Sequence, residues 1–379
     1  MAKPQVLVFI DWYLPGYKAG GPVRSLANLV DHLRDEVDFH IVTRNTDYTE
    51  SIPYPGVEPD RWTRLPGGEQ VWYASRQGTG RKAWRRLLRE RKWDALYING
   101  LYSWWYNIVP LWLARTRITR RVVASRGMLA SGAMRHGALK KLLFLSLARM
   151  ADLYKGVRFQ ATNAEEAGDI RNYLLRHAEV AVVPNLPRKV VVQRTALAKE
   201  RGSVKLVALG RIAVEKNTLL AIESLQAVKG RVHFTLYGQV YDEGYWEQCR
   251  RAMEALPPHV VVEHKGAVAP DEVPGVLATH HALFMPSAGE NFGHAMLEAL
   301  CAGRPLLISD RTPWRDLEQD HAGWDLPLDG KDAFSDAVDR LCAMDQSEYD
   351  TWSDGAYARG ARYLADPAPV RASLQLFLP

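Results

Sequence analysis

Short apolar runs alternate with amphipathic stretches along most of the chain, and this alternation predicts the fold. In the first half, runs typical of buried strands lie at residues 5–10, 38–43, 71–75, 95–100, 121–125, 157–162 and 180–184. An amphipathic helix is predicted between the first two runs, at residues 22–33, and helix-period stretches separate several of the others. Strands that alternate with helices in this way form a parallel sheet covered by helices.

The pattern restarts after residue 202 and predicts a second unit of the same kind. Its strand-like runs lie at residues 204–210, 232–237, 260–264, 282–286 and 305–309. Its predicted helices lie at residues 217–228, 242–255 and 293–301. We therefore predict an α/β protein of the GT-B type, with two Rossmann-like, doubly wound parallel-sheet domains facing each other across a cleft. Ligands of such folds bind at the carboxyl ends of the strands.

The domain boundaries follow from a change of pattern between the two halves. Residues 1–186 form the predicted first domain, and residues 187–202 form a linker that is rich in charge and has little periodicity. Residues 203–360 form the predicted second domain. The tail, residues 361–379, is expected to pack back on the first domain.

Charge is distributed unequally between the halves of this 379-residue chain. Residues 1–185 hold 28 lysines and arginines against 17 aspartates and glutamates, a formal charge of +11, and the remainder carries −5. A composition of 47% hydrophobic and 24% charged residues is typical of a globular protein. The basic half suggests an anionic partner, for which nucleic acid, an anionic membrane and a pyrophosphate-linked lipid are all open.

Three cysteines, Cys249, Cys301 and Cys342, are far apart in the sequence. This spacing argues against a disulfide framework or a structural zinc site and fits a reducing compartment. The chain starts directly in a strand-like run without the features of a signal peptide, and no apolar run is long enough to span a bilayer. We expect a cytoplasmic protein, with peripheral attachment to the inner face of the cell membrane left open.

Two glutamates bracket the most informative stretch, PSAGENFGHAMLEAL. Glu290 lies in a loop after a predicted strand, and Glu298 lies inside the helix that follows. They are roughly 8–12 Å apart at a rise of 1.5 Å per residue, which suits the two ends of one elongated ligand. A sugar hydroxyl on Glu290 and ribose hydroxyls on Glu298 would describe a sugar nucleotide. The alternative is a capping glutamate and a partly solvated helix glutamate.

Two predicted helix starts could receive a phosphate through backbone amides. One lies between the two glutamates, at Phe292, Gly293 and His294. The other follows the first strand, where the paired Gly20 and Gly21 allow close approach of the backbone to a ligand. A double glycine by itself also fits a plain tight turn.

Two cations follow the first strand of the second half, in the stretch LGRIAVEKN. Gly210 ends the strand, Arg211 follows at once, and Lys216 lies five residues on. A pair of cations on a loop facing the cleft could neutralise a diphosphate leaving group. Ordinary solvated loop cations are the alternative.

Together these features resemble the GT4 family of GT-B glycosyltransferases, and the resemblance covers nearly the whole chain. The E-x7-E element, the GR…EK element and the GG loop occur in the family's order and at its usual separations. Further similar segments are ENFGHAMLEAL with CAGRPLLISDRTPW after it, SRGML, ATNAEEAGDI and VVPN. These motifs look like the branch that builds bacterial capsule, exopolysaccharide or lipopolysaccharide chains.

The resemblance implies a role for each residue toward a nucleotide diphosphate-sugar. Arg211 and Lys216 would hold the diphosphate and act in catalysis with Glu290, which would contact hydroxyls of the donor sugar. Glu298 would contact the ribose, and Val268 would lie near the base. The other donor-binding residues that the resemblance implies are Gly20, Gly21, Arg126, Gly210, Gly238, Asn291, Phe292, Gly293 and His294.

Three departures from the family's pattern concern single positions. Asn291 stands where many members have glycine, and asparagine tolerates the left-handed backbone that glycine permits. The linker reads PNLP rather than PNG followed by an acidic residue. Many members use a histidine of the first domain near the donor sugar, and here Arg126 of the SRG motif is the candidate for that neighbourhood.

The implied reaction is retaining transfer of a hexose-type sugar from a nucleotide diphosphate-sugar to a hydroxyl of a glycan or polyprenyl-linked acceptor, in surface polysaccharide synthesis. UDP- and GDP-sugars are both open as co-substrates, and no cofactor is expected. No DxD motif occurs in a strand-loop context, so we expect no divalent metal. A GT-B sugar-nucleotide epimerase or phosphorylase is the alternative. The chain shows no nucleic-acid-binding motif, so nucleic acid is not expected as a partner.

Two basic stretches of the first half could contact a membrane or a lipid-linked acceptor. RKAWRRLLRERKW at residues 81–93 and RHGALKKLLFLSLARM at residues 135–150 both combine cations with apolar residues at helical spacing. The alternative is that both are domain helices with solvated basic faces. For residues 135–150 we expect the apolar face to be buried.

Overall fold

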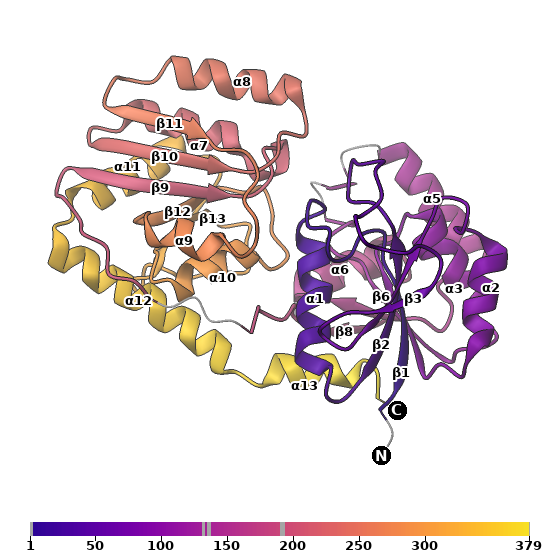
Figure 1. The fold of residues 1–379 in the computed structure, drawn as a ribbon. Coiled ribbons are helices and arrows are strands. Elements are labelled where there is room, and N and C mark those ends of the chain that lie inside the picture. Colours follow the sequence, from indigo (N-terminus) through magenta and orange to yellow (C-terminus); the bar gives the residue numbers. More distant parts are fainter. Residues whose placement is uncertain (1–2, 131–132, 135–137, 190–193, 379) are drawn as a thin grey trace. The chain divides into compact units, whose positions relative to one another are not determined.

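The computed structural model describes residues 3–130, 133–134, 138–189 and 194–378. The chain divides into two compact units, Met1–Lys189 with Pro367–Pro379 (unit 1) and Val190–Asp366 (unit 2). Each unit is built on one sheet with helices on its faces (Figure 1). The prediction of two α/β domains with parallel sheets is confirmed.

Unit 1 contains an eight-stranded sheet of order β3-β4-β2-β1-β5-β6-β7-β8, parallel except for the β3–β4 pair. The chain runs outward from β1 in one direction and then returns to β5 on its other side, so the topological switch point lies between β1 and β5. The strands are β1 (Gln5–Phe9), β2 (Asp38–Arg44), β3 (Trp62–Arg64), β4 (Gln70–Ala74), β5 (Ala95–Asn99), β6 (Arg120–Ala124), β7 (Arg158–Ala161) and β8 (Glu179–Val182).

Helices cover both faces of this sheet because the strand side chains are apolar on both sides. One apolar core joins the strands to α2, α3, α5 and α6, and a second joins them to α1 and the C-terminal α13. Phe377, just after α13, packs edge-on against Phe39 and Tyr97. The helices are α1 (Gly21–Leu33), α2 (Arg81–Glu90), the π-helix η1 (Trp104–Ile108), α3 (Val109–Ala114), α5 (Ala138–Met150), α6 (Ala164–Tyr173) and α13 (Ala368–Gln375).

Unit 2 contains a six-stranded, all-parallel sheet of order β11-β10-β9-β12-β13-β14. Its switch point lies between β9 and β12. The strands are β9 (Ser203–Leu209), β10 (Arg231–Tyr237), β11 (Val260–His264), β12 (Ala282–Met285), β13 (Leu306–Ser309) and β14 (Gly323–Leu326). The helices are η2 (Val214–Lys216), α7 (Thr218–Ser224), η3 (Leu225–Ala227), α8 (Glu243–Glu254), α9 (Val273–Ala278), α10 (His294–Cys301), α11 (Lys331–Ala343) and α12 (Gln346–Ala365).

The described part of the predicted linker packs on unit 2. The fully buried guanidinium of Arg304 donates hydrogen bonds to the carbonyl and hydroxyl oxygens of Thr195. The buried ammonium of Lys199 donates to backbone carbonyls at the end of α11. These bonds explain why the chain after residue 193 is part of unit 2. The prediction had placed residues 187–202 in a linker, of which residues 190–193 lie outside the described residues.

The helix α5 differs from its prediction. Leu145 and Ala148 are buried against the sheet, but the opposite side of the helix exposes Leu139, Leu142, Leu143, Leu147 and Met150. The expectation of a buried apolar face over residues 135–150 is therefore wrong for the described part, residues 138–150. A helix lying on a sheet buries only one stripe of its surface, and here the apolar residues extend beyond that stripe.

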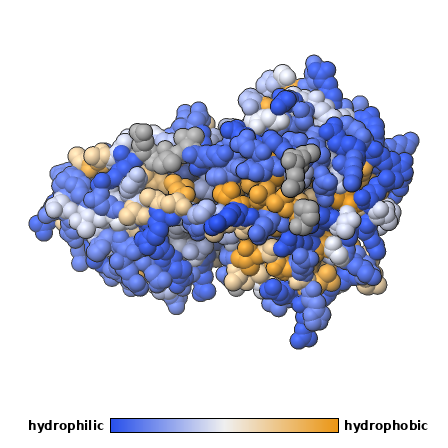
Figure 2. All heavy atoms as spheres, turned by 90° about the horizontal axis from the view of Figure 1, so that it is seen from below, coloured by the Kyte–Doolittle hydropathy of each residue, from blue (hydrophilic) through white to orange (hydrophobic). Residues whose placement is uncertain are grey.

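Most of the surface drawn in Figure 2 is hydrophilic, with apolar side chains gathered in a few patches. Among the described residues, no helix is both long and apolar enough to cross a membrane.

Candidate active site

The residues of the GR…EK and E-x7-E elements lie at the switch point of the unit 2 sheet. The first element follows β9 and the second follows β12, and these two strands are paired in parallel. Loops that leave adjacent strands at a switch point diverge and leave a crevice, which is where α/β sheets bind ligands. The fold therefore brings together two elements that are more than 70 residues apart in the sequence.

Backbone and side-chain hydrogen bonds join the two loops. The amide of Ala288 donates to the carbonyl of Glu215 over 2.9 Å, and Nδ2 of Asn217 donates to the carbonyl of Pro286 over 2.9 Å. Asn217 has a left-handed backbone with φ of 52°, which asparagine accepts more readily than most residues. The loop after β9 is therefore held in place along the loop after β12.

Lys216 and Glu290 form an ion pair between these loops. Glu290 also accepts a hydrogen bond of 3.0 Å from the hydroxyl of Ser287. The side chains of Lys216 and Glu290 are 19% and 13% exposed, so water screens their attraction less than it screens a surface pair. The lysine ammonium has three donors, and one bond to Glu290 leaves the others for a second anion.

Arg211 lies on the same loop and has weaker partners. Its guanidinium is 3.1 Å from the carboxylate of Glu215, and it lies 5.1 Å from the ring centroid of Tyr241. Both members of the ion pair are substantially exposed, and such pairs contribute little to stability. A phosphate can therefore replace Glu215 at small energetic cost.

Gly210 and Gly238 directly follow the neighbouring strands β9 and β10, and their backbones lie close together there. A Cβ at Gly238 would lie 1.8 Å from the carbonyl oxygen of Gly210, so a larger residue does not fit. A Cβ at Gly210 would lie 3.3 Å from the Met285 methyl group and 3.8 Å from Cε of Lys216. Because neither glycine has a side chain, the space beside Lys216 stays open.

Gly293 is the N-cap residue of α10, with a left-handed backbone at φ of 75°. The left-handed backbone favours glycine, and a Cβ there would lie 2.6 Å from the sulfur of Met296, so that side chain would have to shift. The carbonyl of the buried Phe292 accepts a hydrogen bond of 2.8 Å from the indole of Trp314. Among the described residues, no side chain caps α10, which begins at His294. Backbone amides at the start of a helix can bind an anion.

Asn291 and Glu298 flank this helix start. Asn291 has no left-handed backbone, so its place in the family's glycine position causes no strain. Its Nδ2 is buried and has no hydrogen-bond partner in the described part of the chain. Glu298 lies in the middle of α10, and its charge adds to the effect of burial in raising the pKa of Cys301 to about 12. Val268, after β11, packs beside the apolar cluster that contains the residues of α10.

In unit 1, Gly20 and Gly21 follow β1 at the switch point of that sheet. Gly20 is the N-cap of α1 and has φ of 74°, and Gly21 is the first residue of the helix. Apart from the local backbone, no atom of the described residues lies within 4 Å of a Cβ built at either glycine, and none of their side chains caps the helix. A phosphate contact at this helix start stays a prediction.

Arg126 is held by neighbours within unit 1. Its guanidinium donates to Oδ1 of Asn99 over 2.7 and 3.1 Å, to the hydroxyl of Tyr97 over 2.9 Å, and to Oδ1 of Asn185 over 2.5 Å. Its backbone is left-handed, with φ of 53°. These bonds orient the SRG turn after β6, and a contact between Arg126 and a donor sugar stays a prediction.

Two family models match the sequence. The model described as "Glycosyl transferase 4-like domain" matches residues 20–186, and the model described as "Glycosyl transferases group 1" matches residues 203–344. Each match falls within one unit, and together they cover most of the chain. The chain belongs to the GT4-like glycosyltransferases.

Solved structures similar to this glycosyltransferase share its fold at low sequence identity. Anabaena Alr3699/HepE in complex with UDP and glucose has a TM-score of 0.72 and 14% identity, with 98% of each chain covered. Sucrose-phosphate synthase from Thermosynechococcus elongatus has a TM-score of 0.69 and 13% identity, covering 99% of this chain and 97% of that chain. WaaG, a glycosyltransferase involved in lipopolysaccharide biosynthesis, has a TM-score of 0.67 and 12% identity, with 97% and 98% covered. A comparison with curated proteins gave no match.

These similarities confirm the predicted GT-B fold of the glycosyltransferase, with one parallel-sheet domain for each family model. The predicted resemblance to the GT4 family is confirmed as well. The roles of individual site residues remain predictions.

A buried carboxylate that the sequence did not single out organises the SRG turn. Glu166, the third residue of α6, accepts hydrogen bonds from the hydroxyl of Ser125 and the amide of Gly127 through one oxygen. Its other oxygen accepts from the amide and hydroxyl of Thr162. The signal for it was a capping pattern, because Asn163 caps the same helix by accepting from the amide of Glu166.

A second network that the sequence did not single out lies at the switch point of unit 1. Asp11, two residues after β1, accepts hydrogen bonds from Arg44 at 2.8 and 3.2 Å and from the hydroxyl of Ser103 at 2.8 Å. Arg44 ends β2 and Ser103 follows β5, so the cluster joins three adjacent strands at their carboxyl ends. A polar residue placed directly after a buried strand was the available signal.

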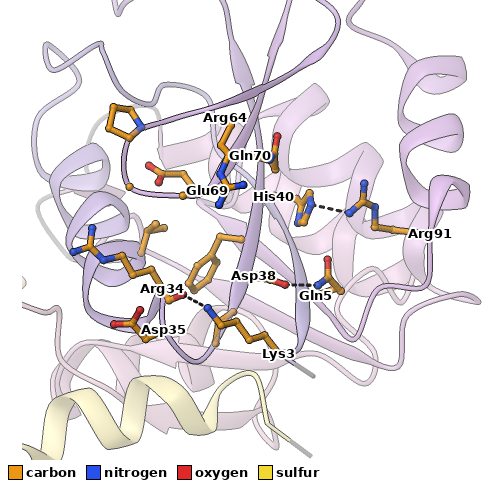
Figure 3. Close-up of a pocket in the computed structure, with 16 residues that line it drawn as sticks. Lys3, Gln5, Arg34, Asp35, Asp38, His40, Arg64, Glu69, Gln70 and Arg91 are labelled. Carbon is orange, nitrogen blue, oxygen red and sulfur yellow. Dashed lines mark hydrogen bonds between the residues drawn. The ribbon is translucent and has the colours of Figure 1, made fainter. Parts of the chain in front are cut away.

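A hollow of about 710 Å³ lies at the amino ends of the unit 1 strands, opposite the switch-point cluster (Figure 3). Its lining includes Gln5, Asp38 and Gln70, which begin β1, β2 and β4. It mixes cations with carboxylates and contains none of the predicted site residues. Ligands of doubly wound sheets bind at the carboxyl ends of the strands, whereas this hollow lies at their amino ends, so it is not a candidate for the donor site.

Proposed function

We propose that this glycosyltransferase moves a hexose-type sugar, with retention of configuration, from a nucleotide diphosphate-sugar to a hydroxyl of a glycan or polyprenyl-linked acceptor. Surface polysaccharide synthesis is the proposed setting. The observation that supports this most is the meeting of Lys216 with Glu290 at the switch point of unit 2, beside the uncapped start of α10. A cation, a helix start and a carboxylate are thus available for the diphosphate and the sugar of one ligand.

The proposed chemistry uses these groups at the bond that breaks. Loss of the glycosidic bond to phosphate places negative charge on the leaving diphosphate, and Lys216 and Arg211 stabilise that charge more in the transition state than in the ground state. Glu290 orients a sugar hydroxyl beside the same ammonium. The acceptor hydroxyl attacks from the face that the diphosphate leaves and passes its proton to a departing phosphate oxygen. The new glycosidic bond forms as the bond to phosphate breaks, so the anomeric configuration is retained. Protein cations supply the positive charge, and we propose no requirement for a divalent metal.

UDP-sugars are the first donors to test. Structures of Anabaena Alr3699/HepE contain UDP, UDP with glucose, or UDP-glucose, and that protein shares this fold over 98% of its chain. GDP-sugars remain the second choice. For the acceptor we propose the carboxyl edge of the unit 1 sheet, where Asp11 and Ser103 form a polar cluster at the switch point. We place the enzyme in the cytoplasm, in peripheral contact with the membrane that holds a lipid-linked acceptor.

The test is a product assay with a panel of UDP- and GDP-sugars and a bacterial lipid-linked glycan fraction as acceptor. We expect one donor to give a glycosylated acceptor and free nucleoside diphosphate, and the new linkage to keep the donor's anomeric configuration in the proton NMR coupling constant. An inverted linkage would contradict the retaining mechanism. Conversion of the sugar nucleotide without any acceptor would favour the epimerase alternative.

A further inference from the structure

The outer side of α5 is an apolar stripe that no described part of unit 1 covers. Leu139 and Met150 are 84% and 83% exposed, and Leu142, Leu143 and Leu147 are between 45% and 62% exposed. Their spacing of three, four, eight and eleven residues from Leu139 places them on one side of the 13-residue helix. A contiguous exposed apolar surface of this kind marks a site of contact with another apolar phase.

Cations flank the stripe on both sides. At roughly 100° per residue, the exposed Lys140 falls just beyond Leu147, and the exposed Arg149 falls just beyond Leu142. Their long side chains can bring the charged ends to the level of lipid headgroups while the leucines lie deeper. Apolar residues bordered by cations in this way are typical of helices that lie in the membrane interface.

The segment of the sequence that contains α5 is strongly basic. No aspartate or glutamate occurs between Asp94 and Asp152, and nine lysines and arginines lie in that segment. The same apolar core that holds α5 also holds α2 and α3 on one face of the sheet, so the three helices belong to one layer (Figure 1). The outer side of α2 adds five more basic residues, and α3 exposes Trp112, a residue type enriched at membrane interfaces.

We propose that the outer face of α5 docks unit 1 on an anionic lipid bilayer. The apolar stripe would enter the boundary between headgroups and acyl chains, and the basic layer would attract the negative surface. A second copy of the chain fits this surface less well, because it would set two basic layers against each other. The inference extends the proposed function by placing the enzyme where a lipid-linked acceptor resides, but the docking itself requires no catalysis.

Co-sedimentation with vesicles tests the docking directly. The protein without donor is mixed with phosphatidylcholine vesicles, with and without phosphatidylglycerol, at low and at physiological salt. We expect binding to the anionic vesicles only, with at least a tenfold lower partition coefficient for the double variant Leu143→Ser/Leu147→Ser. The matched control is Ile52→Ser, which removes another exposed apolar side chain of unit 1 and should bind like the unaltered protein.

A fluorescent label reports which surface enters the lipid. All three cysteines of the chain are buried, so Leu143→Cys introduces an exposed thiol for an environment-sensitive dye. We expect a blue shift of the dye at position 143 when anionic vesicles are added. The same dye at Ile52→Cys should keep its emission in water.

Two results would overturn the proposal. One is the absence of both co-sedimentation and the blue shift with anionic vesicles at low salt. The other is a dimer in sedimentation velocity that Leu143→Ser/Leu147→Ser dissociates, because the stripe would then be a contact between copies of the chain. If the unaltered protein transferred no sugar to a soluble acceptor, that result would contradict the proposed function and leave these binding results unaffected.

Discussion

Lys216 and Glu290 contact each other across two loops that leave adjacent strands of the unit 2 sheet, and this pair is the centre of the proposed donor site. The pair is largely shielded from water, and its members come from the two motifs that the resemblance assigns to the diphosphate and to the donor sugar. In a sugar nucleotide those two groups are separated by one bond. The contact between Lys216 and Glu290 is therefore what a site needs if one residue binds the diphosphate and the other binds the adjoining sugar.

We predict that substitutions at this pair are not additive. Lys216→Ala should lower kcat by roughly 10²–10³-fold, the scale observed when a donor that stabilises developing negative charge is removed. Glu290→Gln should also lower kcat, and the double variant should be little slower than Lys216→Ala because the residues act as a unit. Steady-state kinetics of the three variants measure this. Lys265→Ala, which removes an exposed lysine of the same unit, is the control; strictly additive losses would contradict a shared role.

The close approach of two glycines predicts a stability effect. Gly238→Ala should destabilise unit 2 by several kcal/mol, because the new methyl group would overlap the carbonyl of Gly210 and force the two loops apart. Gly275→Ala is the matched control, since it lies in α9 and a Cβ there meets nothing within 4 Å. The control should be neutral or stabilising by up to about 1 kcal/mol. Denaturant unfolding of both variants measures the difference, and equal stabilities would contradict the prediction.

A buried histidine predicts how stability depends on pH. Burial lowers the pKa of His281 to about 4, and its Nδ1 accepts a hydrogen bond of 2.9 Å from the amide of Lys205, which requires the neutral ring. Because the pKa is lower in the folded protein than in the unfolded chain, protons favour unfolding. The contribution of His281 to the free energy of unfolding is fully present above about pH 6.5, and it falls by roughly 3 kcal/mol as the pH drops toward 4.

Thermal unfolding between pH 4 and 7 checks this prediction. The variant His281→Gln should show a smaller decrease of Tm at low pH than the unaltered protein, whatever its Tm at pH 7. Parallel curves for His281→Gln and the unaltered protein would refute the assignment.

Removal of metal ions tests the proposed source of positive charge. If Lys216 and Arg211 neutralise the leaving diphosphate, activity should remain within about twofold in excess EDTA. The assay compares turnover of protein purified in chelator with and without added Mn²⁺ or Mg²⁺. A loss of activity that either ion restores would show that a metal shares the role of the two residues.

The sequence predicted the main strands of both sheets because buried parallel strands form continuous apolar runs. It missed β3, whose three residues lie at the edge of the unit 1 sheet and are only partly buried, and β14, a short edge strand of unit 2. Both are stabilised by pairing with a neighbouring strand rather than by their own pattern. The burial of α5 was also mispredicted, because the number of apolar residues in a helix does not show which side the sheet covers.

At the candidate site, the sequence predicted which loops would meet but not how their side chains pair. The ion pair between Lys216 and Glu290 depends on the register of β9 and β12, which no local pattern encodes. The partners of Arg126 come from two separate segments of unit 1, β5 and the stretch after β8, and no local pattern predicted this pairing. Close approach of Gly238 to Gly210 likewise arises only when the sheet is assembled.

Titration calorimetry with UDP and GDP on the unaltered protein, Lys216→Ala and Lys265→Ala is the most direct measurement. We predict that one of the two nucleotides binds the unaltered protein and the Lys265→Ala control with the same Kd, and that Lys216→Ala raises that Kd at least tenfold, about 1.4 kcal/mol. Unchanged affinity in Lys216→Ala, or no binding of either nucleotide to the unaltered protein, would contradict a diphosphate site at the unit 2 switch point.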